Sequence, residues 1–212
     1  MVKKIVGTGV LLVLALALQA GVKMYTLKSP DGKVKLEVTA GQGIAYSLFY
    51  DGRLLLKPSR IALHTDLPEA DHWENIRITG TKQRHVSETV QAPFYRVKEF
   101  GIDCNELELR LNNGFSLLMR AYNDGMAYRF VAGRKGEMTV VEERAEFNFA
   151  DDFEAYIPYS TNPKDPWNMA FQNFYTKAPL TQYNTELPAF LPLTVDAGAV
   201  KLTLLESDLE AY

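Results

Sequence analysis

The segment RAYNDGMAYRF at residues 120–130 is the strongest indication of the fold. Its centre, Asn123-Asp124-Gly125, has the composition of a tight hairpin turn: Asn and Asp tolerate unusual dihedral angles, and Gly adopts the positive φ that other residues resist. Large apolar residues alternate on both sides of this turn, which places one set of side chains on a single strand face: Phe115, Leu117, Met119, Ala121, Met126, Tyr128 and Phe130. Arg120 and Arg129 point to the other face. The segment therefore predicts a β-hairpin with an apolar inner face.

Further alternating runs surround this hairpin. Residues 34–38 follow an Asp31-Gly32 turn, and residues 46–50 and 53–56 flank an Asp51-Gly52 turn. The alternating run at 106–111 is followed, after an Asn112-Asn113-Gly114 turn, by a second run at 115–122. Residues 106–131 should therefore form a three-stranded meander. One or two strands are expected within 137–149, and two more at 191–195 and 200–205. No stretch longer than ten residues keeps a helical apolar stripe, so the sequence predicts an all-β, antiparallel sandwich or barrel.

The composition is that of an ordinary globular domain. The chain has 212 residues, 47% hydrophobic and 23% charged, with a net charge of −3 and a pI near 5.7. This length fits about one domain. No basic stripe is present, which argues against nucleic-acid binding. Cys104 is the single cysteine, so an intrachain disulfide is excluded and a buried thiol is expected.

The first twenty residues have the pattern of a signal peptide. Lys3 and Lys4 precede an apolar stretch at 10–17, and small residues allow cleavage after Ala17 or Ala20. The uncharged stretch is shorter than the ~20 residues that a membrane span needs. We therefore expect an exported protein, periplasmic or secreted, with a signal peptide at 1–20, a mature domain at 21–212 and no membrane anchor.

One segment, residues 156–192, is rich in proline and aromatic residues. Its rings are Tyr156, Tyr159, Trp167, Phe171, Phe174, Tyr175, Tyr183 and Phe190. Long loops in compact domains are usually functional or disordered, and this aromatic content argues against disorder. The rings, Trp167 first among them, could stack on sugars beside the amides of Asn162, Asn168 and Asn173. Alternatively, they could be buried against another domain or beneath the loop itself.

No catalytic constellation is evident in the residues. Sugar hydrolysis needs two carboxylates about 5–10 Å apart across the scissile bond. Glu142-Glu143 and Asp151-Asp152 are adjacent pairs, which point to opposite faces of a strand, so we expect them to be solvated. His64, His72 and His85 lack the spacing of a zinc site, and no nucleophile elbow, phosphate-binding loop or dinucleotide fingerprint is present.

Six blocks of sequence, in order, resemble the N-terminal β-sandwich domain of glycoside hydrolase family 97. They are LKSPDG at 27–32, LKPS at 56–59, the Asn-Asp-Gly block, AYIP at 155–158, FQNFYTKAPL at 171–180 and LLESDLEAY at 204–212. The family contains α-glucosidases and α-galactosidases. The resemblance implies an antiparallel β-supersandwich like that of galactose mutarotase, which here would be truncated.

The resemblance also implies a role. Family members continue into a (β/α)8 barrel that carries the catalytic glutamates, so we expect this chain to be incomplete and not competent as a hydrolase. It would be the non-catalytic N-terminal domain of an exported enzyme that hydrolyses terminal α-glucosides or α-galactosides. The domain would pack on the barrel and shape the sugar pocket through residues 156–192. The implied substrate-binding residues are Trp167, Tyr175 and Glu206.

A calcium ion lies at the sandwich–barrel junction in the family, held mainly by glutamates. The corresponding residue here is Gln172, whose carbonyl can bind calcium but brings no negative charge. We therefore expect no stable calcium site in this chain alone.

Two alternative functions remain open. The chain could be a free-standing carbohydrate-binding module that uses Trp167 and its aromatic neighbours. It could also be a sugar mutarotase, which requires a positioned His beside a Glu or Asp in a concave sheet. The three histidines precede the best-defined strands. Convergence of one of them with Glu206 in a single cleft would favour the mutarotase function.

Overall fold

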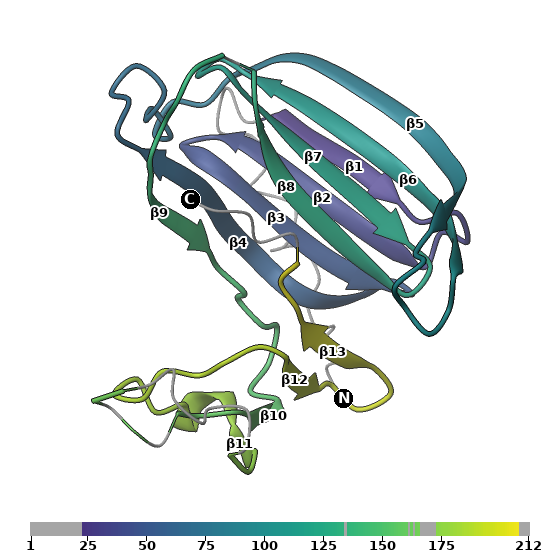
Figure 1. Cartoon of the computed structure of the whole chain (residues 1–212), viewed down its shortest axis with the longest axis vertical. Helices are drawn as coiled ribbons and strands as arrows, with labels where there is room; N and C mark the ends of the chain where they lie inside the picture. The colour runs from purple at the N-terminus through teal and green to yellow at the C-terminus, as the bar shows by residue number, and fades with distance from the viewer. Residues whose placement is uncertain (1–22, 134, 161, 163, 166–172, 208–212) are drawn as a thin grey trace, which may run out of the picture.

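The computed structural model describes residues 23–133, 135–160, 162, 164–165 and 173–207, which form three antiparallel sheets (Figure 1). The first sheet has the order β1-β2-β3-β4-β9: β1 (Lys23–Lys28), β2 (Val34–Gly41), β3 (Gly43–Tyr50), β4 (Arg53–Thr65) and β9 (Val140–Ala145). The second has the order β5-β6-β7-β8: β5 (Ile78–Gln91), β6 (Glu99–Leu111), β7 (Phe115–Tyr122) and β8 (Gly125–Ala132). The small sheet has the order β11-β10-β12-β13: β10 (Glu154–Ile157), β11 (Thr176–Pro179), β12 (Leu193–Asp196) and β13 (Lys201–Leu204).

The all-β prediction is confirmed for these residues, whose one helical element is the 3-10 turn η2 (Leu180–Gln182). None of the helical structure in this part of the chain is long and apolar enough to cross a membrane.

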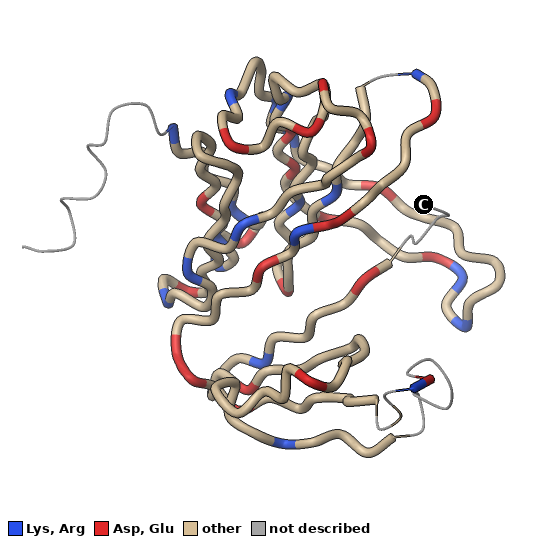
Figure 2. The backbone as a smooth tube through the Cα atoms, turned by 90° about the vertical axis from the view of Figure 1, so that its left-hand side faces the viewer, with Lys and Arg blue, Asp and Glu red and all other residues tan. Residues whose placement is uncertain are grey.

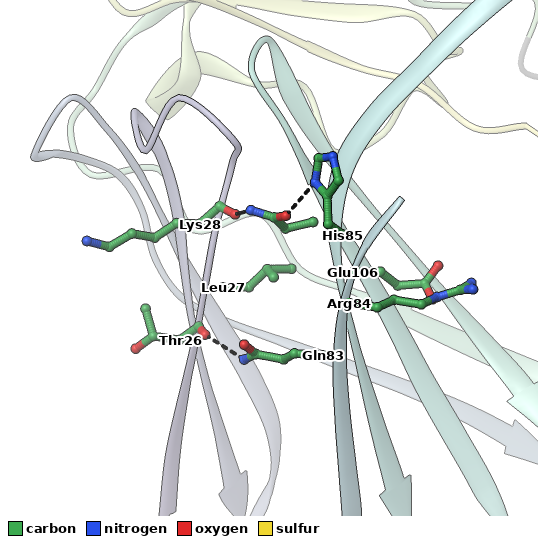
Figure 3. Close-up of a pocket in the computed structure, with 8 residues that line it drawn as sticks. Thr26, Leu27, Lys28, Gln83, Arg84, His85 and Glu106 are labelled. Carbon is green, nitrogen blue, oxygen red and sulfur yellow. Dashed lines mark hydrogen bonds and ion pairs between the residues drawn. The ribbon is translucent and has the colours of Figure 1, made fainter. Parts of the chain in front are cut away.

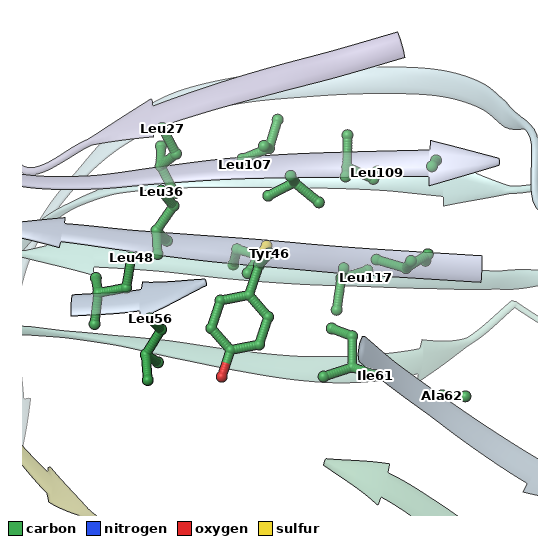
Figure 4. Close-up of a cluster of buried hydrophobic side chains, with 14 of the residues drawn as sticks. Leu27, Leu36, Tyr46, Leu48, Leu56, Ile61, Ala62, Leu107, Leu109 and Leu117 are labelled. Carbon is green, nitrogen blue, oxygen red and sulfur yellow. The ribbon is translucent and has the colours of Figure 1, made fainter. Parts of the chain in front are cut away.

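The main core lies between the first and second sheets, which are stacked face to face (Figures 1 and 4). Strict alternation in β2 and β7 sends every second side chain inward, and the inward residues are fully or almost fully buried. Leu36 and Tyr46 from the first sheet meet Leu107 and Leu117 from the second. Each such side chain contributes roughly 1.5–3 kcal/mol when it leaves water.

The predicted hairpins form, with one correction to the central turn. Tyr122 pairs with Gly125 across a two-residue loop, but Gly125 does not adopt the positive φ predicted for it. It is the first residue of β8 and has extended geometry. Asn123 instead ties this turn to the one before β2, because its Oδ1 accepts a hydrogen bond from the Asp31 N–H at 3.0 Å.

The long strand β5 is an element that the sequence did not reveal. Most of its side chains are polar on both faces, and Val86 is its one buried residue, so no one-sided alternation marks it. It pairs with β6, the first strand of the predicted meander. Cys104 on β6 is buried, as expected for a spectator thiol.

Part of the segment expected to be a proline-rich loop is regular structure. Strand β11 and the turn η2 fall within it, and β11 pairs with β10 to build the small sheet. That sheet has its own core of Ala155, Ile157, Tyr159 and Val195. Figure 2 shows it below the two stacked sheets. It is joined to them through Arg53, which donates from Nη1 to the Ala197 carbonyl at 2.7 Å.

Candidate functional site

Two of the sequence-predicted site residues, Trp167 and Gln172, lie outside the described residues. Tyr175 is described and sits just before β11 with 48% of its surface exposed. Its hydroxyl donates to the Pro192 carbonyl at 3.3 Å, which fixes the direction of the ring. Phe174 beside it is 98% exposed. Two aromatic rings of this segment are therefore presented to solvent.

Tyr159 anchors the same segment from beneath. Its carbonyl accepts a hydrogen bond from Asn173 Nδ2 at 3.0 Å, and its hydroxyl accepts one from the Asn184 N–H at 2.6 Å. Its ring is buried and lies 5.4 Å from the ring of Tyr183, centroid to centroid. The aromatic residues predicted to bind sugar therefore have two different roles. Tyr159 stabilises the segment, while Phe174 and Tyr175 remain accessible to solvent.

Glu206, the second predicted site residue that the structure describes, is exposed after β13, and its charge acts on Glu143, which the sequence analysis expected to be solvated. Its charge, second to burial, raises the pKa of Glu143 on β9. Glu143 Oε1 accepts a hydrogen bond from the Tyr128 hydroxyl on β8 at 3.4 Å. Burial is the main cause that raises the pKa of Tyr128, and Glu143 and Glu206 add to it. Three segments distant in sequence therefore place Glu143 in contact with Tyr128 and close enough to Glu206 for the charge of Glu206 to influence both groups.

In this group, defined as Tyr128, Glu143 and Glu206, the phenol ring is held by aromatic neighbours. The Tyr128 ring packs against Tyr46 and Phe130, each with centroids 6.1 Å apart. Carboxylates accept hydrogen bonds, and a carboxyl of raised pKa or a phenol can also donate them. Chemically, the group is suited to hydrogen bonding with hydroxylated ligands. Glu142 is exposed, as the sequence analysis predicted, whereas the partly buried carboxyl of Glu143 contacts Tyr128.

A pocket of about 460 Å³ lies between β1 and the β5–β6 hairpin (Figure 3). Two of its side-chain amides are engaged with the edge of β1: Gln83 Nε2 donates to the Thr26 carbonyl at 3.1 Å, and Asn105 Nδ2 donates to the Lys28 carbonyl at 2.9 Å. Glu106 is turned to the other face. The lining thus mainly secures the β1 edge against the second sheet.

The described contacts of His85 and His64 are with residues other than Glu206, whose convergence with a histidine would favour a mutarotase. His85 Nδ1 lies 3.0 Å from Asn105 Oδ1, and its Nε2 lies 3.1 Å from Asp103. His64 Nδ1 lies 2.7 Å from Asp71 Oδ1. Both histidines therefore have acidic partners other than Glu206.

No group of three or more His, Cys, Asp or Glu side chains is placed to hold a metal ion within the ranges that the structure describes. The single position that the resemblance assigns to calcium, Gln172, falls outside those ranges.

Comparison with known proteins identifies the family. Residues 27–212 match the model of the glycosyl-hydrolase 97 N-terminal domain. The chain is 41% identical over 204 residues to a retaining alpha-galactosidase of Bacteroides thetaiotaomicron, covering 93% of this chain and 30% of that protein. It is 26% identical over 158 residues to a probable retaining alpha-galactosidase of Streptomyces bingchenggensis, covering 73% of this chain and 24% of that one.

Solved structures agree in fold. A glycoside hydrolase family 97 enzyme from Pseudoalteromonas sp. strain K8, in complex with panose, superimposes with a TM-score of 0.65 at 19% identity, over 81% of this chain and 26% of that one. A beta-arabinopyranosidase superimposes with a TM-score of 0.69 at 22% identity, over 81% and 29%. The chain thus spans less than a third of the length of these relatives. With a family model that matches nearly the whole chain, this protein belongs to the glycosyl-hydrolase 97 N-terminal domain family.

Proposed function

We propose that this chain is the non-catalytic N-terminal domain of an exported α-glycosidase whose intact form hydrolyses terminal α-galactosides or α-glucosides. The observation that carries the proposal is the 41% identity to a retaining alpha-galactosidase over almost the whole chain. That relative favours an α-galactoside substrate over an α-glucoside. Export rests on the signal-peptide pattern at residues 1–20.

The domain's role in the intact enzyme would be to pack on a catalytic (β/α)8 barrel and shape the sugar pocket. In this proposal, the stacked sheets are part of a galactose-mutarotase-like β-supersandwich. Tyr175 and Phe174 offer exposed rings to a sugar, since π-faces suit sugar C–H groups. The group of Tyr128, Glu143 and Glu206 supplies hydrogen-bonding partners. By its resemblance to the family, Gln172 would correspond to the sandwich ligand of the family's calcium ion.

The test begins with the coding sequence that follows Tyr212. If it continues into a barrel, the full protein is expressed and assayed with p-nitrophenyl α-galactoside and α-glucoside. We expect hydrolysis of the α-galactoside, and none by the 212-residue chain alone. A full protein that cleaves neither substrate would contradict the proposal. The thermal midpoint of the 212-residue chain should not change when calcium is added, because Gln172 contributes no charge.

A second candidate is a free-standing carbohydrate-binding module, and the exposure of Phe174 and Tyr175 favours it. Calorimetric titration of the 212-residue chain with melibiose and maltose distinguishes the two functions. Binding that disappears in Tyr175→Ala would support the module. A lack of heat with both sugars would leave the enzyme-domain function.

A further inference from the structure

The outer edge of β5 has no paired strand among the described residues, although the Gln83 side chain bonds to β1. In the second sheet β5 is a terminal strand, and among the described residues only β6 pairs with it. Pairing of β6 with β7 ends at Cys104 and Tyr122, whereas β5 and β6 stay paired as far as Gln91 and Glu99. The outer part of this hairpin is therefore a two-stranded arm.

This arm carries apolar side chains into solvent. Phe94 and Tyr95 in its turn are 99% and 73% exposed. A two-stranded hairpin by itself is only marginally stable in water, and an open strand edge is a template for pairing with another chain. Pairing with another strand would therefore stabilise the arm, and its unpaired edge allows such pairing.

The direction of the backbone groups follows from the turn of the hairpin. The Ala92 N–H donates to the Lys98 carbonyl at 2.7 Å, and the register is regular from Gly80 to Gln91. Since antiparallel strands alternate, even-numbered residues bond to β6. The odd-numbered residues then direct their N–H and C=O groups to the open edge: Thr81, Gln83, His85, Ser87 and Thr89.

On the outer face of the second sheet, a row of side chains with alternating charge crosses β7, β6 and β5 and ends at the same edge. Arg120, Glu106 and Arg84 lie directly opposite one another on β7, β6 and β5. Glu106 accepts hydrogen bonds from Arg120 Nε at 2.7 Å and from Arg84 Nε at 2.6 Å. The row stops at Arg84, whose side chain is 53% exposed. A strand added at this edge would be favoured by an anion opposite Arg84.

We propose that the edge of β5 is a self-association surface, on which β5 of a second copy adds antiparallel with Val86 on the two-fold axis. In this register Glu88 of each copy lies opposite Arg84 of the other, and the two Val86 side chains face each other. Moving the axis to Arg84 or to Glu88 would place like charges in contact. The contact is isologous and closes as a dimer, which joins the two second sheets into one. This dimer does not depend on the proposed enzymatic role.

Sedimentation of the 212-residue protein over a concentration series tests the proposal. A strand edge buries less area than a standard interface, so we expect a reversible dimer in the micromolar range. Glu88→Arg turns both Arg84–Glu88 pairs into repulsions and should raise the dimer dissociation constant about tenfold or more. Glu137→Arg changes the charge equally at an exposed site outside β5 and should leave the constant unchanged.

A second variant and a second measurement address the backbone itself. Ser87→Pro removes an N–H that faces the open edge and leaves the bonds to β6, so it should abolish the dimer while the circular dichroism spectrum is kept. Amide exchange at Gln83, His85 and Ser87 should slow as the wild-type concentration rises. A protein that stays monomeric up to about 1 mM would overturn the proposal. A dimer whose dissociation constant is unchanged in both β5 variants would overturn it as well.

Discussion

Glu106 lies directly opposite Arg120 on the neighbouring strand and accepts a hydrogen bond from its Nε at 2.7 Å. The carboxylate is almost fully buried and also binds Arg84, so its loss leaves two cations without their shared partner. We expect Glu106→Gln to lower the free energy of unfolding by roughly 1–3 kcal/mol, measured by urea denaturation. Glu108→Gln is the control: Glu108 is more exposed and 3.7 Å from Arg110, so its loss should cost less than about 0.5 kcal/mol. Equal costs for the two variants would contradict a special role for the buried carboxylate.

The same carboxylate should make stability depend on pH. Burial opposes its ionisation, but the bonds from Arg84 and Arg120 prevail and hold the pKa of Glu106 below its ordinary value of 4.5. A lowered pKa in the folded state means that its stabilisation is complete above the unfolded pKa and is lost as pH falls through the folded pKa. The difference in unfolding free energy between wild type and Glu106→Gln should therefore be constant above about pH 5.5 and shrink below about pH 4.5. A difference that stays constant down to pH 3 would rule this out.

The ionisation of Glu143 should affect the pH dependence of stability in the opposite direction to that of Glu106. Burial and the charge of Glu206 raise its pKa, so its ionised form is disfavoured in the folded protein at neutral pH. Acidification through the raised folded pKa relieves this penalty. We expect Glu143→Gln to raise the thermal midpoint slightly at pH 7, by the equivalent of less than about 0.5 kcal/mol, and to have no effect at pH 4. Glu142→Gln serves as the neighbouring control, and an identical rise in that variant would refute the explanation.

Two glycines in hairpin turns should differ in their tolerance of alanine. Gly52 has a φ of 79°, a region that side chains resist, so Gly52→Ala should cost about 1–2 kcal/mol. Gly125 does not have a positive φ, and a Cβ there would meet nothing within 4 Å. Gly125→Ala should therefore lie within about 0.5 kcal/mol of wild type in chemical denaturation. A large loss at Gly125 would show that its turn needs the positive φ after all.

Tyr159 should control the order of the aromatic segment. Its hydroxyl accepts the Asn184 N–H at 2.6 Å inside the small sheet's core, and Tyr159→Phe removes that acceptor without a large change in shape. We expect a loss of about 1–2 kcal/mol and faster proteolytic cleavage near residue 184. Tyr175→Phe removes an exposed hydroxyl bond of 3.3 Å and should leave the cleavage rate unchanged. Equal cleavage rates in both variants would argue against this anchor.

The meander from β6 to β8 could be predicted from the sequence because its information is local. One face of β6 and of β7 is buried and one face of β8 is partly buried, so apolar residues recur at every second position between recognisable turns. β5 escaped prediction for the same reason: it has no buried face apart from Val86, and hence no alternation to detect. The aromatic segment was recognised by composition, but its division between buried Tyr159 and exposed Tyr175 depends on how β10 and β11 pair.

The sequence alone determined the strand periodicity, most of the hairpin turns and, through the order of its blocks, the family. Only the tertiary structure decided which charged groups meet. Glu143 contacts Tyr128 and feels the charge of Glu206 because β8, β9 and the segment after β13 converge. Glu106 lies between two arginines because three strands share one register. Periodicity is a property of neighbouring residues, whereas a register is set by the packing of the whole sheet, so such partners cannot be seen along the chain.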